Sequence, residues 1–350
     1  MSVSKVLLFP FSVLYGAIVG IRNFLFDTGI LASKSFEVPV FCVGNITVGG
    51  TGKTPHTEEL IRRLQERFRV ACLSRGYKRR TSGFILAGEN ATAEEIGDEP
   101  MQIKTKFPGI LVAVDEKRTR GIETLLALPK PPEVIVLDDA FQHRRVKADK
   151  NIVLIDYNRP LSKDCLLPAG RLREPASALR RADYIVVTKC PDHLTPIDKR
   201  LILKKLKVKP YQHLFFTRLK YGEIKPLSSG VPVPTLNRDS ALLCITGIAR
   251  PEPFIRKLRE YTDNMTEIRY SDHHRFGKKE VREIERIFAE IRDPDKYILT
   301  TEKDAVRLRE SELPEEIKQQ IFYIPVEPEF LCQGETFAQE LIAYVAKNKR

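Results

Sequence analysis

The sequence contains no tryptophan, and aromatic residues make up only 8% of its 350 residues. It also shows no basic stripe with interleaved aromatic residues, the pattern on which unpaired bases stack. These absences disfavour a nucleic-acid-dependent ATPase, although the formal net charge of the chain is +12. A charge of this sign favours acidic partners in general, including anionic lipids and phosphorylated ligands.

Cysteine pairs of the C-x-x-C type are also missing, and so are clusters of cysteine with histidine. This spacing argues for reduced thiols in a cytoplasmic compartment and against structural zinc. Internal repeats and low-complexity tracts are absent as well. A hydrophobic content of 42% and a charged content of 30% describe an ordinary globular protein. The six cysteines are scattered: Cys42, Cys72, Cys165, Cys190, Cys244 and Cys332.

Charged residues are missing from residues 6–21, which read VLLFPFSVLYGAIVGI. A membrane-spanning helix needs about 20 apolar residues, so this run is marginal for a full crossing. We expect residues 1–30 to form a membrane-associating anchor helix, with a full span or a buried core helix as the alternatives. A cleaved signal peptide would need a small-residue cleavage site, and no convincing A-x-A pattern follows.

From Phe36 onward, short apolar runs alternate with segments of helical spacing, as in EVPVFCVG followed by HTEELIRRLQERF. This alternation predicts an α/β fold with a doubly wound, mostly parallel sheet of the P-loop NTPase type. We assign this core to residues 31–218. Residues 219–240 are rich in Gly, Pro and Ser and predict a hairpin-like linker, and residues 241–350 predict a smaller α/β domain that closes over the active site.

The segment VGNITVGGTGKTP has the parts of a phosphate-binding loop: a strand, a glycine-rich turn, a lysine and a helix start. It departs from the usual G-x-x-x-x-G-K-[ST] pattern because Thr47 stands where the first glycine is expected. A chance glycine turn is the alternative. The residues expected to bind the nucleotide are Thr47, Gly49, Gly50, Thr51, Gly52, Lys53 and Thr54.

A second nucleotide-site motif, EVIVLDD, places Asp138 and Asp139 after a continuous apolar run. With the Thr54 hydroxyl, these carboxylates predict a Mg²⁺ site of the Walker B kind. Guanine specificity is disfavoured, since TKCPD carries its acid one residue too far on and TEKD has the wrong order.

Eight motifs occur in a fixed order along most of the chain: GNITVGGTGKTP, SRGYKRR, GDEP, LDDAFQHRRV, LPAGRLREP, ITGIARPEPF, SDHHRF and TTEKDAVRL. Together they resemble the tetraacyldisaccharide 4′-kinase family, the lipid A 4′-kinases of Gram-negative bacteria, in which Thr47 is usual. The resemblance implies ATP- and Mg²⁺-dependent phosphorylation of the 4′-hydroxyl of a tetraacylated glucosamine disaccharide 1-phosphate. It also implies that the enzyme acts at the cytoplasmic face of the bacterial inner membrane.

The resemblance further implies catalytic roles for Asp98 as the base, His273 as its supporting histidine, and Lys53 at the phosphates. Glu99 is the alternative base if Asp98 is not, and His274, the neighbour of His273, is the alternative histidine. A purely structural role for Asp98, as the N-cap of a helix, is the third alternative. Positions matched to phosphate, sugar or substrate contacts are Arg75, Tyr77, Glu99, Arg118, Gln142, His143, Arg173 and Glu174.

One residue departs from the family pattern: Ala140 replaces the glycine of D-D-G-F-Q-H. A methyl group is tolerated there if φ is negative and strains the turn if φ is positive.

A partner-regulated P-loop ATPase that delivers a metal or another client is the second hypothesis, because its glycine-rich loop would look similar. The apolar N-terminus and the separate GDEP acid favour the kinase, and a C-x-x-C client site is absent. We expect an acylated lipid substrate and the inner membrane surface as partners, with no nucleic acid and no obligate protein partner.

Overall fold

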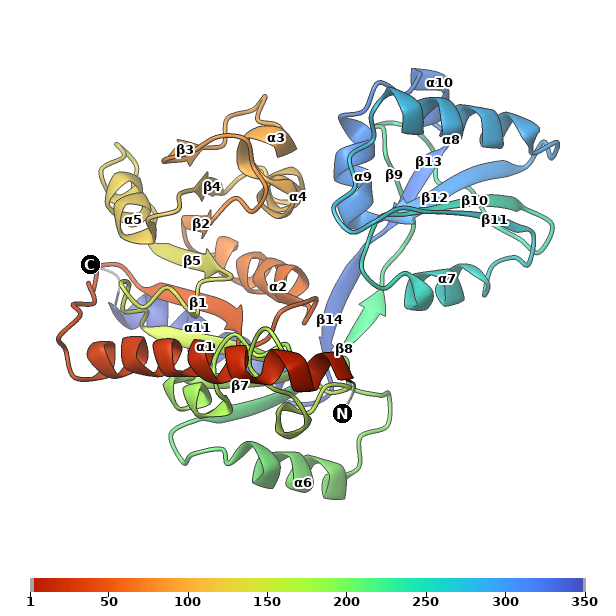
Figure 1. The fold of residues 1–350 in the computed structure, drawn as a ribbon. Helices are drawn as coiled ribbons and strands as arrows, with labels where there is room; N and C mark the ends of the chain where they lie inside the picture. The colour runs from red at the N-terminus through yellow and green to blue at the C-terminus, as the bar shows by residue number, and fades with distance from the viewer. Residues whose placement is uncertain (1–2, 349–350) are drawn as a thin grey trace.

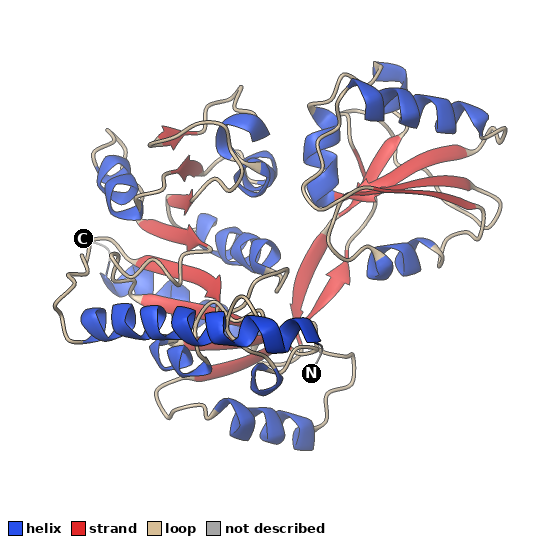
Figure 2. Cartoon of the chain, in the orientation of Figure 1, coloured by secondary structure: helices blue, strands red, loops and turns tan. Residues whose placement is uncertain are grey.

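The computed structural model describes the backbone of residues 3–348 and the side chains of residues 6–348. It contains two β-sheets, each with helices packed against it, in two parts that lie side by side and are joined by two neighbouring strands (Figures 1 and 2). We call the part around the nine-stranded sheet the first lobe and the part around the five-stranded sheet the second lobe. The predicted α/β class, with a mostly parallel sheet and an apolar N-terminal helix, is confirmed.

The first sheet has the order β14-β8-β7-β6-β1-β5-β2-β4-β3, and all of its neighbouring strands are parallel except at the two edges, where β3 and β14 pair antiparallel. Its strands are β1 (Val40–Asn45), β2 (Val70–Ser74), β3 (Ile85–Leu86), β4 (Leu111–Val114), β5 (Val134–Asp138), β6 (Lys150–Asp156), β7 (Tyr184–Thr188), β8 (His213–Tyr221) and β14 (Val326–Phe330). The helical segments of this lobe are α1 (Val3–Asp27), α2 (Lys53–Gln65), α3 (Ala93–Ile96), α4 (Asp98–Lys106), α5 (Arg118–Leu126), η1 (Leu161–Lys163), η2 (Ala176–Arg181), α6 (Pro196–Leu206) and α11 (Gly334–Asn348).

Both faces of this sheet are covered, which is why its strands are continuous apolar runs. In β1, the side chains of Phe41 and Val43 join one buried cluster with α2, α4 and α11. Those of Val40 and Cys42 join a second cluster with α5 and η2. The alternation follows from the two-residue period of a strand, and it makes the sheet doubly wound.

The second sheet has the order β11-β10-β12-β13-β9. Its strands are β9 (Lys225–Pro226), β10 (Ala241–Thr246), β11 (Met265–Arg269), β12 (Lys296–Thr301) and β13 (Ile321–Ile324), and its helices are α7 (Glu252–Leu258), α8 (Lys278–Glu290), α9 (Glu302–Arg309) and α10 (Glu315–Lys318).

The domain boundaries expected from the sequence differ from this topology at both ends of the second lobe. β14 returns to the first sheet and pairs with β8, and α11 buries Phe337, Leu341 and Val345 in the first lobe. The predicted linker is partly strand, since β9 pairs with β13. The apolar spacing of α11 predicts a buried face but carries no signal for which of the two sheets it covers.

The helix α1 lies along the surface of the first lobe (Figure 1), so the buried-core alternative is wrong. Among the described residues it is the one helix long and apolar enough to cross a membrane, by length and composition alone. Several polar contacts hold it: Ser12 Oγ donates to Leu166 O at 2.9 Å, Tyr15 OH donates to Arg173 O at 2.9 Å, and Arg22 bonds Glu174. Near its end, Arg144 bonds Asn23 O and Asp27. Most of its large apolar side chains face solvent.

Candidate active site

The glycine-rich loop connects the carboxyl end of β1 to the start of α2, at the edge where parallel sheets bind ligands. Gly49 has φ 98° and Gly52 has φ 87°, in the left-handed region that L side chains rarely adopt. Lys53 and Thr54 begin α2, so the positive end of the helix dipole and the lysine face the same turn.

Thr47 fits its position because the backbone there is extended rather than left-handed. It forms an antiparallel bridge with Leu172, while Val48 N donates to Arg171 O at 2.8 Å. The loop is therefore tied to the segment that reads LPAGRL. Inside the loop, Thr51 Oγ1 accepts a hydrogen bond from Asn45 Nδ2 at 2.9 Å. The missing glycine thus reflects a strand-like bridge that a threonine can occupy.

Asp138 and Asp139 follow β5, next to β1, at the same edge of the sheet. Asp138 is buried and accepts a hydrogen bond from Thr57 Oγ1 at 2.9 Å. Burial, and then the nearby charges of Glu99 and Asp139, raise the pKa of the Asp138 carboxyl above its usual range. A buried concentration of negative charge of this kind calls for a cation.

Asp139 is the link between these acids and the phosphate loop. Arg173 NH1 donates to it at 2.9 Å, and Lys53 Nζ lies 3.7 Å away. No group of three or more His, Cys, Asp or Glu side chains able to hold a metal occurs in the described part of the chain. Mg²⁺ often takes only one or two carboxylates and completes its shell with phosphates and water, so the oxygen set of Thr54, Asp138 and Asp139 fits that ion.

The backbone of the turn after β5 accommodates Ala140 without a left-handed conformation at that residue. The left-handed residue of this turn is Asp139, with φ 46°, and Ala140 is not among the residues with positive φ. The Ala140 methyl is buried in the cluster on the α5 face of the sheet. The alanine therefore does not strain the loop.

Asp98 and His273 meet across the two lobes. His273 Nδ1 lies 2.9 Å from Asp98 Oδ2, and Arg307 Nε lies 3.5 Å from the same oxygen. Asp98 is the first residue of α4, the N-cap position belongs to Gly97, and no side chain caps this helix. The N-cap alternative for Asp98 is therefore wrong.

His274 points elsewhere: its Nε2 lies 3.3 Å from Glu280, and its ring stacks on Tyr270. The histidine that pairs with Asp98 is thus His273.

A lysine completes this cluster and fixes the proton on the histidine. Lys303 Nζ lies 3.0 Å from His273 Nε2. An ammonium group can only donate, so Nε2 accepts and the ring proton sits on Nδ1, where it is donated to Asp98. Burial alone would raise the pKa of Asp98, but the hydrogen bond from His273 and the charges of Arg307 and Lys303 lower it below its ordinary value. Asp98 is therefore ionised at neutral pH.

The cluster around Asp98 and His273 lies next to the Asp138–Asp139 pair. Glu99, next to Asp98 on α4, is close enough to raise the pKa of Asp138, and it lies 4.0 Å from Lys303. The Tyr77 side chain is exposed, with its ring centroid 5.6 Å from that of His273. The structure thus brings Lys53, Asp138, Glu99 and Asp98 to one edge of the first sheet.

The remaining predicted residues divide into those near this edge and one that is not. Gln142 Nε2 donates to Asn45 O at 2.8 Å beside the loop. Burial lowers the pKa of Arg118 to about 10, and the charges of Asp138 and of the exposed Arg75 also act on it. Burial and then the charges of neighbouring arginines, Arg118 first, lower the pKa of His143 to about 4, so this ring is neutral at pH 7.

Glu174 is the predicted residue that the structure does not bring to the open site. Its side chain is fully buried, and its carboxylate bonds Arg22 of α1 and Arg181 of η2. Its neighbour Arg173 instead reaches Asp139. Glu174 therefore holds the N-terminal helix against the first lobe.

Several cations around the loop were not singled out from the sequence. Lys189 Nζ donates to Gly50 O and lies 3.1 Å from Asp156. Burial and the charge of Arg250, which comes from the second lobe, lower the pKa of Arg159. A Cβ on Gly49 would lie 3.1 Å from Arg159 NH1, so that guanidinium sits against the turn. Arg250 lies in the motif ITGIARPEPF, which was the available signal for it.

The acid of TKCPD is engaged in an ion pair, since Arg218 NH1 donates to Asp192 Oδ1 at 2.7 Å.

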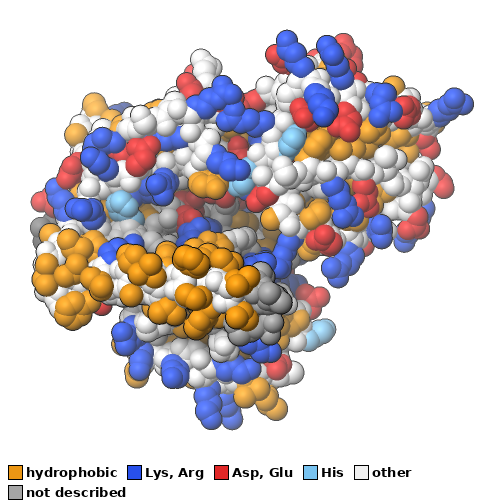
Figure 3. Space-filling model, viewed as in Figure 1, with side chains coloured by type: hydrophobic (Ala, Val, Ile, Leu, Met, Phe, Trp, Pro, Cys, Tyr) orange, Lys and Arg blue, Asp and Glu red, His pale blue; other side chains and the backbone are white. Residues whose placement is uncertain are grey.

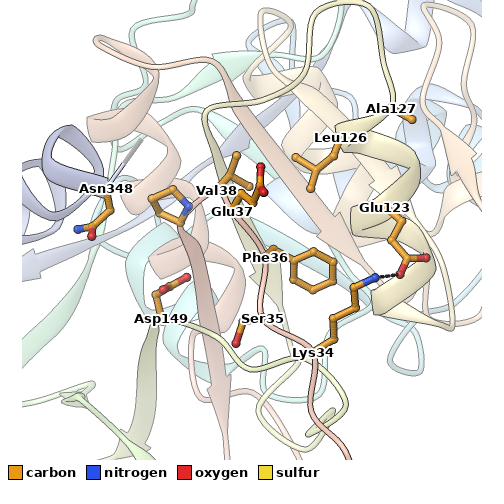
Figure 4. Close-up of a pocket in the computed structure, with 11 residues that line it drawn as sticks. Lys34, Ser35, Phe36, Glu37, Val38, Glu123, Leu126, Ala127, Asp149 and Asn348 are labelled. Carbon is orange, nitrogen blue, oxygen red and sulfur yellow. Dashed lines mark hydrogen bonds and ion pairs between the residues drawn. The ribbon is translucent and has the colours of Figure 1, made fainter. Parts of the chain in front are cut away.

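A broad cavity of about 840 Å³ lies elsewhere, around Lys34, Val38 and Glu123 (Figure 4). Val38 and Pro39 precede β1, so this cavity is at the amino end of the strand, away from the phosphate loop. Ligands of parallel sheets bind at the carboxyl end, and we therefore place the active site there and not in this cavity.

Known proteins of one family match this chain along almost its whole length. The family model described as tetraacyldisaccharide-1-P 4′-kinase matches residues 4–346. A protein of Bacteroides fragilis named tetraacyldisaccharide 4′-kinase is 50% identical, with 98% of this chain and 94% of that protein covered. A protein of Porphyromonas gingivalis with the same name is 49% identical, with 97% of each chain covered. The crystal structure of an "apo" form of LpxK from Aquifex aeolicus in complex with ATP is 30% identical, with a TM-score of 0.76 and coverage of 97% of this chain and 99% of that chain.

Proposed function

The chain belongs to the tetraacyldisaccharide-1-P 4′-kinase family, and from this membership we propose how its residues act on ATP and on the lipid acceptor. The protein is a kinase that uses ATP to phosphorylate the 4′-hydroxyl of a tetraacylated glucosamine disaccharide 1-phosphate, a lipid A precursor. The alternative of a client-delivering ATPase is not favoured by these relatives. One observation supports the assignment of roles above all: the Asp98–His273 pair lies beside the phosphate loop and the Asp138–Asp139 pair.

The phosphates of ATP bind in the turn from Gly49 to Gly52. Backbone N–H groups of the turn and the amino end of α2 face the phosphate oxygens, as in other phosphate loops. Lys53 then exchanges its contact with Asp139 for the β- and γ-phosphates. Arg159 and Lys189 add positive charge on the other side of the turn.

Mg²⁺ would be held by Thr54, Asp138 and Asp139. When bound, this ion would neutralise charge on the phosphate oxygens and stabilise the negative charge of the leaving group. Asp138 must ionise to take part, and a cation beside it would lower the pKa that burial, Glu99 and Asp139 raise.

Asp98 accepts the proton of the acceptor 4′-hydroxyl as that oxygen attacks the γ-phosphorus. His273 orients the carboxylate through its Nδ1–H, and Arg307 keeps it ionised. A positioned base of this kind contributes about 10²–10⁴-fold to the rate. Tyr77, exposed beside His273, and the exposed Arg75 would contact the sugar or its 1-phosphate.

The acceptor places the reaction at a membrane, because each acyl CH₂ that leaves the bilayer costs about 0.8 kcal/mol. We place the enzyme at the cytoplasmic face of the inner membrane, with the exposed apolar side chains of α1 as the anchor. ATP is available on that side. No protein partner is needed for the chemistry described.

The test is transfer of the γ-phosphate of ATP to the detergent-dispersed acceptor, comparing wild type with Asp98→Asn. We expect turnover to fall about 10²–10⁴-fold while ATP binding stays within about twofold. Asp239→Asn, an exposed acid of the second lobe, is the matched control and should keep full activity. Unchanged turnover in Asp98→Asn would remove the base assignment, and loss of ATP binding would make Asp98 a structural or metal-binding residue.

A further inference from the structure

The exposed apolar side chains of the protein are concentrated in two places. Of the eighteen large apolar side chains exposed in the described part of the chain, eleven lie between residues 6 and 30 and only three lie outside both places. The other four are Ile197, Leu201, Leu203 and Tyr211, on α6 and just after it. Isolated exposed apolar residues are normal, but a second concentration on one short element is not.

The helix α6 is well formed although none of its side chains is buried. A capping box fixes its start: Thr195 Oγ1 accepts from Asp198 N, and the Asp198 carboxylate accepts from Thr195 N. Residues 197, 200, 201 and 204 share one face at helical spacing. Ile197 and Leu201 alternate there with Arg200 and Lys204, and all four are exposed.

Positive charge dominates this element. Six cations and one acid, Asp198, lie between residues 196 and 209. Five of the cations form no ion pair with any carboxylate among residues 6–348: Arg200, Lys204, Lys205, Lys207 and Lys209. The sixth, Lys199, packs over the ring of Phe216.

The position of α6 relates it to the membrane anchor. A cavity of about 590 Å³ lies under α6, between Ile202 and Leu206 on the helix and Leu161 and Leu179 on the segment from η1 to η2. The same segment carries the carbonyl of Leu166 to which α1 is bonded. The helices α1 and α6 therefore flank one segment of the first lobe. Figure 3 shows the apolar surface of α1, with Lys and Arg side chains over α6 at the lower edge of the same face.

We propose that α6 and residues 207–211 form a second membrane contact, which binds the anionic headgroups of the bilayer that α1 enters. Apolar side chains between cations suit the headgroup boundary, because Ile and Leu enter the acyl region while Lys and Arg keep their charges among phosphates. Unpaired cations near an anionic surface attract it, and the effect falls off within a Debye length. Two contacts on either side of one segment would fix how the lobe faces the lipid, which a single helix cannot do. The inference rests on the proposed function only for the membrane role of α1.

Vesicle co-sedimentation of the full chain tests this surface. The probes are vesicles of phosphatidylcholine alone and of phosphatidylcholine with phosphatidylglycerol, at low and high salt. Arg200→Glu/Lys204→Glu should weaken partitioning to the anionic vesicles at least about 10-fold, and Ile197→Ser/Leu201→Ser should weaken it to both. Lys279→Glu/Arg282→Glu on α8 makes the same charge change on exposed, unpaired cations of the second lobe and should bind as wild type.

Phosphate transfer to the detergent-dispersed acceptor should be unchanged in all these variants, which shows that they are folded. Wild-type partitioning of Arg200→Glu/Lys204→Glu, or an equal loss in the α8 control, would overturn the proposal. Preferential loss of RNA binding or of a protein partner, with vesicle binding intact, would also overturn it. If wild type lacked kinase activity, the proposed function would fail while the vesicle result would still decide the role of α6.

Discussion

Lys303→Met removes the ammonium group that holds His273 and leaves an apolar side chain of similar length. Lys303 Nζ lies 3.0 Å from His273 Nε2, 3.7 Å from Asp272 and 4.0 Å from Glu99. The lysine side chain is 23% exposed and the histidine side chain 13% exposed, so the contact is only partly screened by water. Without it, the imidazole can place its proton on either nitrogen, and only one of these tautomers donates to Asp98.

The expected loss follows from the strength of that contact. A hydrogen bond from a charged donor is worth about 1.5–3 kcal/mol. If it is needed to orient Asp98 in the transition state, kcat should fall about 10- to 100-fold, because each 1.36 kcal/mol is tenfold in rate. The KM for ATP should change little, since Lys303 contacts no residue of the phosphate loop.

The pH profile gives a second readout with a defined sign. Asp98 acts as a base only when ionised, so activity falls as pH falls through its pKa. Burial raises that pKa, and His273, Arg307 and Lys303 together lower it. Glu310 is the nearby acid of the second lobe that opposes them. Removing the charge of Lys303 raises the pKa of Asp98, and the acid limb of kcat/KM should move to higher pH.

The assay is steady-state phosphate transfer from pH 3 to 8, a range that includes the acid limb set by Asp98, together with ¹⁵N NMR of the His273 ring. Lys303→Arg keeps a charged donor and should recover part of the activity, while Lys278→Met, an exposed lysine of α8, is the control. Wild-type kcat with an unmoved acid limb in Lys303→Met would refute this role for Lys303. A ring that stays fully in the Nδ1–H form in Lys303→Met would show that Lys303 does not fix the tautomer, and an Nε2–H ring in the wild type would refute the tautomer assignment.

Two further predictions concern stability. Lys106 lies 2.6 Å from Glu58 and 2.9 Å from Glu302, and it is the cation that joins these largely buried acids across the lobes. Lys106→Met should lower the free energy of unfolding by about 3–5 kcal/mol. Burial, and then the charge of Glu302, raise the pKa of the Glu58 carboxyl. An acid whose pKa is raised on folding destabilises the folded state as pH rises through that folded pKa. The loss of unfolding free energy in Lys106→Met, measured by denaturation, should therefore be larger at pH 8 than at pH 5. Ala140→Gly should destabilise by about 0.5–1 kcal/mol with activity unchanged, because the left-handed residue is Asp139; a gain in melting temperature would contradict this.

Local pattern was sufficient to predict the backbone elements that carry the proposed nucleotide site. A strand, a glycine-rich turn and a helix start lie within a few residues of one another, and a strand-end acid belongs to one apolar run. Such features depend on backbone geometry that neighbouring residues determine. The position of Thr47 needed the structure, because its partner Leu172 lies in a distant loop.

The acceptor half of the site could not be reached in the same way. His273 lies 175 residues from Asp98, and only the packing of the second lobe against α4 brings them together. Without the resemblance to a family, neither the motif GDEP nor the motif SDHH indicates that the two lie in contact. Lys303 lies in the motif TTEKDAVRL and in the failed guanine pattern TEKD, but the sequence predicts no role for it, although its place on α9 brings it to His273. Glu174 shows the opposite case: its place beside Arg173 predicts a substrate contact, whereas its buried carboxylate bonds Arg22 of α1.

The division of charge between the lobes explains why the proposed mechanism needs the second lobe. The first lobe supplies Asp98, Glu99 and Asp138. The charge of Glu99 opposes ionisation of Asp138, and all three carboxylates would repel the phosphates of ATP. The second lobe contributes Lys303 and Arg307 at the base and Arg250 near the phosphate loop. Because the cations that keep Asp98 ionised come from the other lobe, an isolated first lobe would bind phosphates through its loop but would lack a tuned base. With Asp98 as the proposed base, contact between the lobes is a condition of the proposed reaction, and α9 carries the two cations, Lys303 and Arg307, that provide it.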